Sequence, residues 1–284
     1  MWHKLKITLH MITFEHTVFA LPFALIAALL AQGGLPSAWQ VFWIVAAMVG
    51  ARSAAMTFNR IVDLDYDRAN PRTRERALPS GRLSMSFAVI FTAAMSALFL
   101  ISAGMLNRLC LYLSVPTLLV LLGYSYTKRF TLLSHFVLGF AIGLAPLGAW
   151  LAISGEIALS PILLGFTVML WIAGFDLIYS CQDTEFDLQR QLFSIPAHWG
   201  KHRALVVSSL LHVATVIVLF VIAWLSNLGA VAYGGITVVA AILYWEHHIV
   251  RPDDLSRVNV AFFTLNGYVS LLLLAAFATD ILVS

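Results

Sequence analysis

Apolar segments recur along the chain, and their lengths approach the roughly 20 residues that a helix needs to cross a bilayer. Hydrophobic residues make up 61% of the chain and charged residues 11%, whereas a soluble domain carries about 25% charged residues. The mean hydropathy is +0.89. These values predict one all-α integral-membrane domain over residues 1–284. We expect about nine transmembrane helices, at 11–31, 38–58, 86–105, 109–127, 133–153, 160–181, 204–225, 229–249 and 259–280.

Basic residues are distributed unevenly among the loops that join these segments. Of the 17 Lys and Arg residues, only Arg52 and Arg108 lie outside the N-terminus and the even-numbered connections. The positive-inside rule therefore predicts a cytoplasmic N-terminus in a plasma membrane, such as a bacterial inner membrane. It places four loops on the same side, at 59–85, 128–132, 182–203 and 250–258.

A polar motif follows the second apolar segment directly. Asn59, Asp63 and Asp67 are spaced four residues apart, so they share one face if the helix continues. A single carboxylate at such a position is usually a solvated helix end. Three polar groups on one face indicate instead a cation site on the cytoplasmic side.

A second motif has similar spacing near the end of the sixth segment. Asp176, Tyr179, Asp183 and Asp187 again lie on one helical face. Facing carboxylates repel each other unless a cation lies between them. The two motifs therefore predict a shared central cavity.

The chemistry of this cavity follows from its oxygen ligands and from the arginine-rich loops beside it. All-oxygen ligands suit Mg²⁺, which prefers one or two carboxylates together with substrate phosphates. Asp65 and Glu185 fall off the two faces, and we expect both to be solvated. The sequence thus indicates a bound diphosphate that Mg²⁺ links to the protein.

Both motifs resemble the signature motifs of the UbiA superfamily of intramembrane prenyltransferases. The resemblance extends to RT at 72–73, RALPSG at 76–81 and GYSYTKR at 123–129. FEHTVFALPFA at 14–24 and SCQDTEFD…SIPAHWG at 180–200 are similar to the branch labelled 4-hydroxybenzoate polyprenyltransferase. The first helix lacks the Asp-Arg-Pro-like sequence of the ubiquinone-pathway enzymes, which leaves the aromatic acceptor open.

The resemblance implies an Mg²⁺-dependent enzyme of ubiquinone or menaquinone biosynthesis. Its substrates are a polyprenyl diphosphate and a hydroxylated aromatic acid, with 4-hydroxybenzoate favoured and a dihydroxynaphthoate as the alternative. Within the superfamily, a porphyrin or a glycerol phosphate is a further possible acceptor. We expect membrane lipid as a further partner and no nucleic acid. A divalent-cation transporter is the rival from another functional class.

Roles for individual residues follow from the family and the residue types together. Asn59, Asp63 and Asp67 are expected to hold one Mg²⁺, and Asp183 and Asp187 a second; these aspartates and Asp176 form the catalytic set. The remaining expected roles are diphosphate binding by Arg72 and Lys128, and acceptor or allylic-cation binding by Arg52, Tyr124 and Tyr179.

Two groups of polar residues have simpler alternatives. Arg52 lies within the second segment, where it could bind the acceptor carboxylate or form a salt bridge with Asp176 or Glu15. Near the last cytoplasmic loop, we expect a solvated cluster of His247, His248, Asp253 and Asp254.

Overall fold

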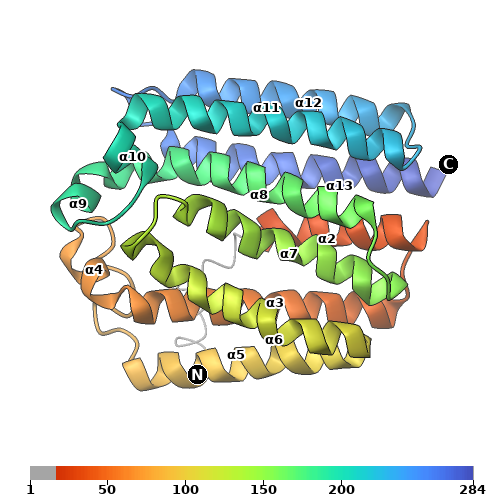
Figure 1. Ribbon diagram of the computed structural model, residues 1–284, viewed down its shortest axis with the longest axis horizontal. Helices are drawn as coiled ribbons and strands as arrows, with labels where there is room; N and C mark the ends of the chain where they lie inside the picture. The colour runs from red at the N-terminus through yellow and green to blue at the C-terminus, as the bar shows by residue number, and fades with distance from the viewer. Residues whose placement is uncertain (1–16, 284) are drawn as a thin grey trace. The chain divides into compact units, whose positions relative to one another are not determined.

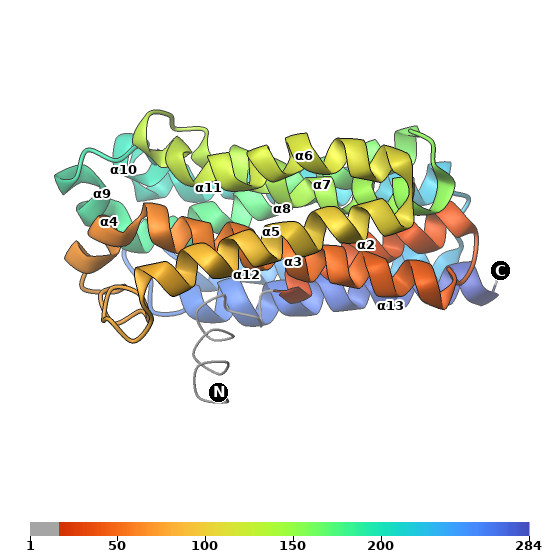
Figure 2. The same ribbon diagram turned by 90° about the horizontal axis from the view of Figure 1, so that it is seen from below.

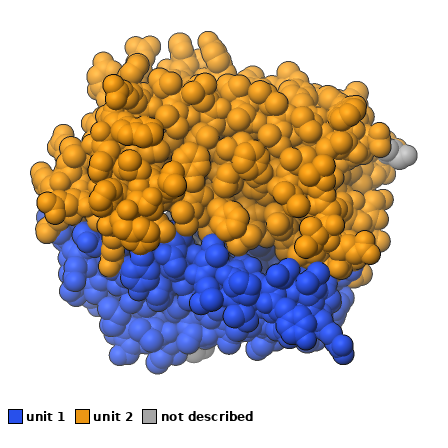
Figure 3. Space-filling model, viewed as in Figure 1, with its two compact units in different colours: residues 1–17, 39–126 blue, residues 18–38, 127–284 orange. Residues whose placement is uncertain are grey.

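The computed structural model describes residues 17–283, and this part of the chain is helical with no strands. It contains two compact units (Figure 3). Unit 1 includes Trp39–Tyr126, and unit 2 includes Val18–Ala38 and Thr127–Ser284. The expectation of a single domain stays a prediction.

Unit 1 carries the first polar motif at the end of a long helix. Its helices α5 and α6 pack along each other (Figures 1 and 2). The elements of this part of the chain are α3 (Ala38–Val62), α4 (Leu64–Ala69), α5 (Met85–Leu106), α6 (Arg108–Gly123) and the 3₁₀ helix η2 (Tyr124–Arg129), which continues into unit 2 from Thr127 onward.

Unit 2 carries the second motif, and its α8 packs against both α7 and α11 (Figure 1). Trp171 and Ile172 of α8 are fully buried, which places this helix in the core of the unit. The elements are α2 (Thr17–Gln32), α7 (Ser134–Ser154), α8 (Leu159–Ser180), the 3₁₀ helix η3 (Cys181–Asp183), α9 (Thr184–Gln189), α10 (Ile195–Trp199), α11 (Lys201–Leu225), α12 (Ala230–Ile249), the π-helix η4 (Val260–Leu265) and α13 (Asn266–Val283).

The predicted transmembrane segments coincide with helices throughout the described chain. Seven of these helices are long and apolar enough to cross a membrane. Helix α2 is shorter over its described residues, and α12 is not among the seven. The multi-pass character is thus clear, whereas the count of nine stays a prediction. The predicted cytoplasmic position of the N-terminus concerns residues outside the described part of the chain and stays a prediction.

Small residues allow α7 and α8 to approach each other closely. His135, Gly139 and Gly143 follow at four-residue intervals on α7, so they share one face. A Cβ atom at Gly139 would lie 2.4 Å from the Met169 carbonyl oxygen, and one at Gly143 would lie 2.5 Å from that of Gly165. Glycine is therefore needed where the two backbones meet, and the same face carries His135 toward α8.

The Gly139→Ala variant should consequently be destabilised by about 1–3 kcal/mol, because the added methyl group overpacks a backbone contact. Gly148→Ala in the same helix is the matched control, since a Cβ atom there meets nothing within 4 Å. Thermal unfolding of both variants in detergent measures the difference. Equal melting temperatures would show that the helices can move apart at little cost.

Candidate active site

The first motif retains its four-residue spacing although the helix is interrupted. Helix α3 ends at Val62, and Asp63 leaves the helical region with φ −93° and ψ 13°. Backbone hydrogen bonds still join Asp63 N to Asn59 O at 2.9 Å and Asp67 N to Asp63 O at 2.7 Å. Asn59 Nδ2 donates to Asp63 Oδ2 at 2.8 Å. The structure therefore brings an amide and a carboxylate of this motif together.

Asp67 has different neighbours from those that the spacing predicted. It is 6% exposed, and Arg76 Nη1 donates to its Oδ1 at 2.7 Å. Arg60 Nη1 lies 3.8 Å from Oδ2. The expectation was that Asp67 would converge with the other two motif residues on one cation. In the structure, the carboxylate forms ion pairs with two arginines, and its role in binding a cation stays a prediction.

The proline-marked loop after α4 supplies Arg76 because the loop folds back on its own unit. Ala77 and Leu83 are buried against Met56, Phe87 and Phe91. The Thr73 hydroxyl donates to the Asp67 carbonyl oxygen at 3.1 Å. Arg72, an expected diphosphate ligand, lies in this loop and is exposed.

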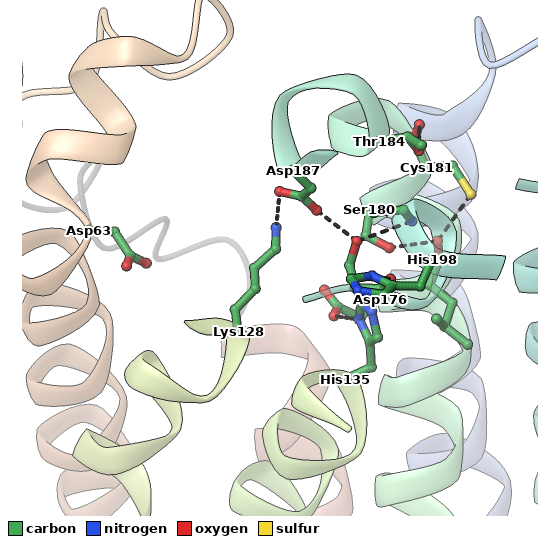
Figure 4. A network of polar contacts seen from close by, with 12 residues as sticks. Asp63, Lys128, His135, Asp176, Ser180, Cys181, Thr184, Asp187 and His198 are labelled. Carbon is green, nitrogen blue, oxygen red and sulfur yellow. Dashed lines mark hydrogen bonds and ion pairs between the residues drawn. The ribbon is translucent and has the colours of Figure 1, made fainter. Parts of the chain in front are cut away.

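The second motif ends on a buried ion pair. Asp187 is 0% exposed, and Lys128 Nζ lies 2.8 Å from its Oδ1 (Figure 4). The Ser194 hydroxyl donates to Oδ2 at 2.8 Å. The backbone N–H of Phe193 donates to the Lys128 carbonyl oxygen at 2.7 Å, which ties the loop before α10 to the lysine. Lys128 was expected to bind the diphosphate and Asp187 to bind a metal ion. In the structure, the two side chains form an ion pair with each other.

Asp176 also has a partner that the spacing did not reveal. His135 Nδ1 lies 2.6 Å from Asp176 Oδ2 (Figure 4). The histidine is 2% exposed, and its Nε2 is buried without a hydrogen-bond partner among the described residues. A proton on Nδ1 therefore fits this environment best, and the imidazole donates to the carboxylate.

His135 could have been found from its position in the sequence. It stands at the start of one predicted helix, and Asp176 stands near the end of the next. Consecutive antiparallel helices bring such ends together. Asp176 was one of two proposed salt-bridge partners for Arg52, and its contact is with His135. The other proposed partner, Glu15, lies outside the described residues.

The two expected aromatic residues lie in different surroundings. The Tyr179 ring packs on Phe262 of the π-helix, with centroids 4.3 Å apart and planes 35° apart. Tyr124 begins η2 in unit 1 and lies within electrostatic range of the Arg52 guanidinium. Two residues expected to bind the acceptor thus lie near each other.

The predictions for the neighbouring charges can also be compared with the structure. The Asp65 side chain is 95% exposed and Glu185 is exposed, so both predictions of solvation are confirmed. The prediction for His247 is wrong. This residue is half-buried and hydrogen-bonds to His212, because α12 turns its face toward α11.

The residues of the two motifs fit Mg²⁺ only with help from a substrate. Within residues 17–283, no three His, Cys, Asp or Glu side chains gather closely enough to hold a metal. Mg²⁺ accepts one or two carboxylates when phosphate oxygens complete its shell. Asp67 Oδ2 is buried without a hydrogen bond from the described residues. It and the Asn59–Asp63 pair offer the oxygen ligands that such a shell requires.

Comparison with known proteins shows similarity over most of the chain. Residues 20–268 match the model of the UbiA prenyltransferase family. A protein named 4-hydroxybenzoate octaprenyltransferase from Cronobacter sakazakii is 30% identical over 252 residues, covering 89% of this chain and 86% of that protein. A protein with the same name from Tolumonas auensis is 29% identical and covers 87% and 85%.

Solved structures show the same similarity. The apo structure of a UbiA homolog from Aeropyrum pernix K1 has a TM-score of 0.86 and 37% identity, covering 94% of this chain and 98% of that one. A UbiA homolog from Archaeoglobus fulgidus bound to DMAPP and Mg²⁺ has a TM-score of 0.74 at 20% identity, covering 96% and 98%. At 20% identity, the similarity to this second structure shows a shared fold alone.

Proposed function

Since the chain belongs to the UbiA prenyltransferase family, we propose that it transfers a polyprenyl group from a polyprenyl diphosphate to a hydroxylated aromatic acid, with 4-hydroxybenzoate as the favoured acceptor. The curated relatives named 4-hydroxybenzoate octaprenyltransferase support this choice. Family membership also favours an enzyme over the divalent-cation transporter. The product would enter quinone biosynthesis.

One observation carries the proposal: both motifs end on a buried aspartate that is paired with a basic side chain. Arg76 lies 2.7 Å from Asp67, and Lys128 lies 2.8 Å from Asp187. A diphosphate and its Mg²⁺ can replace these pairs, because the cations would then contact phosphate and the carboxylates would contact metal. Each charge thus keeps an opposite charge beside it.

The metal-holding roles follow from this exchange. Asn59, Asp63 and Asp67 would hold one Mg²⁺, and Asp183 and Asp187 would hold a second. When bound, Mg²⁺ neutralises the negative charge that develops on the diphosphate.

The basic residues bind and orient the donor. Lys128, Arg72 and Arg76 would donate charge-assisted hydrogen bonds to phosphate oxygens, and such bonds strengthen as the leaving group gains charge. The bond between C1 of the prenyl chain and its oxygen breaks, and an allylic cation forms. Aromatic faces stabilise cations, and Tyr124 and Tyr179 are the proposed faces.

The acceptor side involves three residues. Arg52 would bind the acceptor carboxylate, because a guanidinium matches a carboxylate with two parallel hydrogen bonds. The new C–C bond forms ortho to the hydroxyl group, and the ring proton then passes to the Asp176 carboxylate. His135 is a positioning residue in this scheme, since its Nδ1–H holds Asp176 Oδ2 at 2.6 Å.

An assay with purified protein tests the proposal directly. The protein is incubated with Mg²⁺, a prenyl diphosphate and one of three acceptors: 4-hydroxybenzoate, a dihydroxynaphthoate or phenol. We expect product with 4-hydroxybenzoate and little with phenol, which lacks the carboxylate for Arg52. Product only with the dihydroxynaphthoate would reassign the acceptor, and no product with any acceptor or donor length would contradict the proposal.

The role of His135 yields a separate expected result. His135→Leu removes the donor to Asp176 and should lower kcat by about tenfold, with little change in the KM of the prenyl diphosphate. His135→Asn should recover much of the loss, because its Nδ2–H can take the place of Nδ1–H. Steady-state kinetics of both variants measures kcat and the KM of the prenyl diphosphate separately. A purely structural histidine would lower thermal stability in both variants without a selective effect on kcat.

A further inference from the structure

Helices α11 and α12 line an open groove of about 350 Å³ that contains no residue of either acidic motif. Each helix contributes five residues with the spacing i, i+3, i+4, i+7 and i+8, which describes one helical face. We call this open groove the α11–α12 groove. Its lining consists of Ser209, His212, Val213, Val216, Ile217, Ala240, Leu243, Tyr244, His247 and His248.

The groove is amphipathic along its length. Ser209 and His212 lie toward the start of α11, and His247 and His248 lie at the end of α12. Since consecutive helices joined by a short loop run antiparallel, these polar residues gather at one end. Val216, Ile217 and Ala240 line the other end. The lining residues of each helix extend over eight residues, so each side of the groove is about 12 Å long at a rise of 1.5 Å per residue.

The open side of the groove carries exposed apolar side chains. Val213 is 55% exposed, Ile217 57% and Tyr244 73%. The first two residues lie within Lys201–Leu225, one of the helices that can span a membrane. Exposed apolar side chains at that depth contact acyl chains. A ligand can therefore enter this groove directly from the bilayer.

A chain of hydrogen bonds ends at the polar end of the groove. His212 is 2% exposed, and its Nε2 lies 3.3 Å from the Trp171 carbonyl oxygen. A carbonyl oxygen only accepts, so His212 carries its proton on Nε2. His247 Nε2 lies 2.9 Å from His212 Nδ1 and therefore donates to it. In neutral His247, Nδ1 is left as an acceptor.

The surroundings of His212 favour the neutral imidazole. Glu246 is 0% exposed, and its Oε1 accepts from Asn266 Nδ2 at 3.0 Å. Its Oε2 lies 4.0 Å from His212 Nδ1, which exceeds hydrogen-bond distance. A buried imidazolium without a hydrogen-bonded carboxylate is costly. Trp171 Nε1 donates to Asn266 Oδ1 at 2.6 Å, so the network is anchored in the core.

We propose that the α11–α12 groove binds a prenylated phenol from the bilayer, with the phenol hydroxyl donating to His247 Nδ1 and the isoprenoid tail lying along Val216, Ile217 and Ala240. A ketone or an ether has no proton for this acceptor. An anionic head group would need a cation beside it, and His212, whose surroundings favour the neutral imidazole, supplies none. The source of this ligand rests on the proposed function, because the product of that reaction is an ortho-prenylated phenol. The binding chemistry of the groove does not depend on the proposed function.

Photo-crosslinking with the protein in phosphatidylcholine nanodiscs tests the proposal. The probe is 2-geranylphenol with a diazirine on its tail, and crosslinked peptides are mapped by mass spectrometry. We expect labels on α11 and α12 within the groove, and we expect unlabelled 2-geranylphenol to compete at least tenfold better than its methyl ether. The proposal is overturned if labels map elsewhere, or if the ether competes equally. It is also overturned if geraniol or dioleoylglycerol competes equally, since the site would then take any lipid alcohol.

Variants provide a second measurement. His247→Phe should weaken competition by about tenfold, because it removes one hydrogen bond to the ligand. Ala240→Trp should abolish labelling by filling the groove. Val238→Trp is the matched control, because Val238 is 50% exposed on α12 and does not line the groove. Unchanged labelling in Ala240→Trp would overturn the proposal even if His247→Phe failed to fold.

Turnover of His247→Phe, measured in parallel, should equal that of the unmodified protein. Because labelling needs no turnover, an inactive protein that is labelled in the groove would contradict the proposed function alone. An active protein without these labels would contradict only the proposal that the groove binds a prenylated phenol.

Discussion

Asp63→Asn and Asp183→Asn are each expected to lower kcat by about two to three orders of magnitude, as is typical when a group that stabilises transition-state charge is lost. Both aspartates are half-buried in their motifs, and asparagine keeps their shape while it removes the charge that a metal ion requires. The measurement is steady-state turnover with saturating Mg²⁺. A chelator should abolish turnover in the unmodified protein.

The chain offers a control beside each position. Asp65→Asn and Glu185→Gln remove the same charge from exposed side chains of the same two segments. They should retain full activity, which would exclude a general effect of net charge. Full activity of Asp63→Asn or Asp183→Asn would remove that residue from the proposed metal site.

Lys128→Met should lower the free energy of unfolding by about 3 kcal/mol in the absence of Mg²⁺, because it leaves the Asp187 carboxylate buried without its cation. The Asp187 side chain is 1% exposed, whereas Lys128 is 36% exposed. The loss therefore comes mainly from the aspartate. The same variant should bind the prenyl diphosphate more weakly, since Lys128 is a proposed phosphate ligand.

Magnesium should restore part of this stability. If Asp187 is a metal ligand, Mg²⁺ supplies the missing positive charge, and the ion raises the melting temperature of Lys128→Met more than that of the unmodified protein. Arg129→Met is the control, because it removes the adjacent, exposed cation. Equal Mg²⁺ effects in all three proteins would place Asp187 in a structural ion pair rather than in the metal site.

The membrane character and the helix positions of this chain could be predicted from its sequence alone. Hydrophobic length locates the helices, and each predicted segment coincides with one over the described residues. The spacing of Asn59 and Asp63 also determined their contact, because i and i+4 residues share a face even across the break at Asp63. The exposure of Asp65 and Glu185 followed from the same periodicity.

The pairing of the charged side chains, in contrast, depends on how the helices and loops pack. Periodicity assigns residues to a face of one helix, but it does not show which helix or loop lies opposite that face. Arg76 reaches Asp67 because the loop after α4 folds back on buried Ala77 and Leu83. His135 reaches Asp176 because glycines let α7 approach α8 closely.

The hydrogen bond of His247 could not be predicted from helical periodicity either. Because His247 lies near a loop that was predicted to be cytoplasmic, it was expected to be solvated, yet it hydrogen-bonds to His212. Its position 35 residues along the chain from His212 carries no local signal of that contact. The packing of α11 against α12 creates both the hydrogen bond and the groove, because two helical faces must meet before either exists.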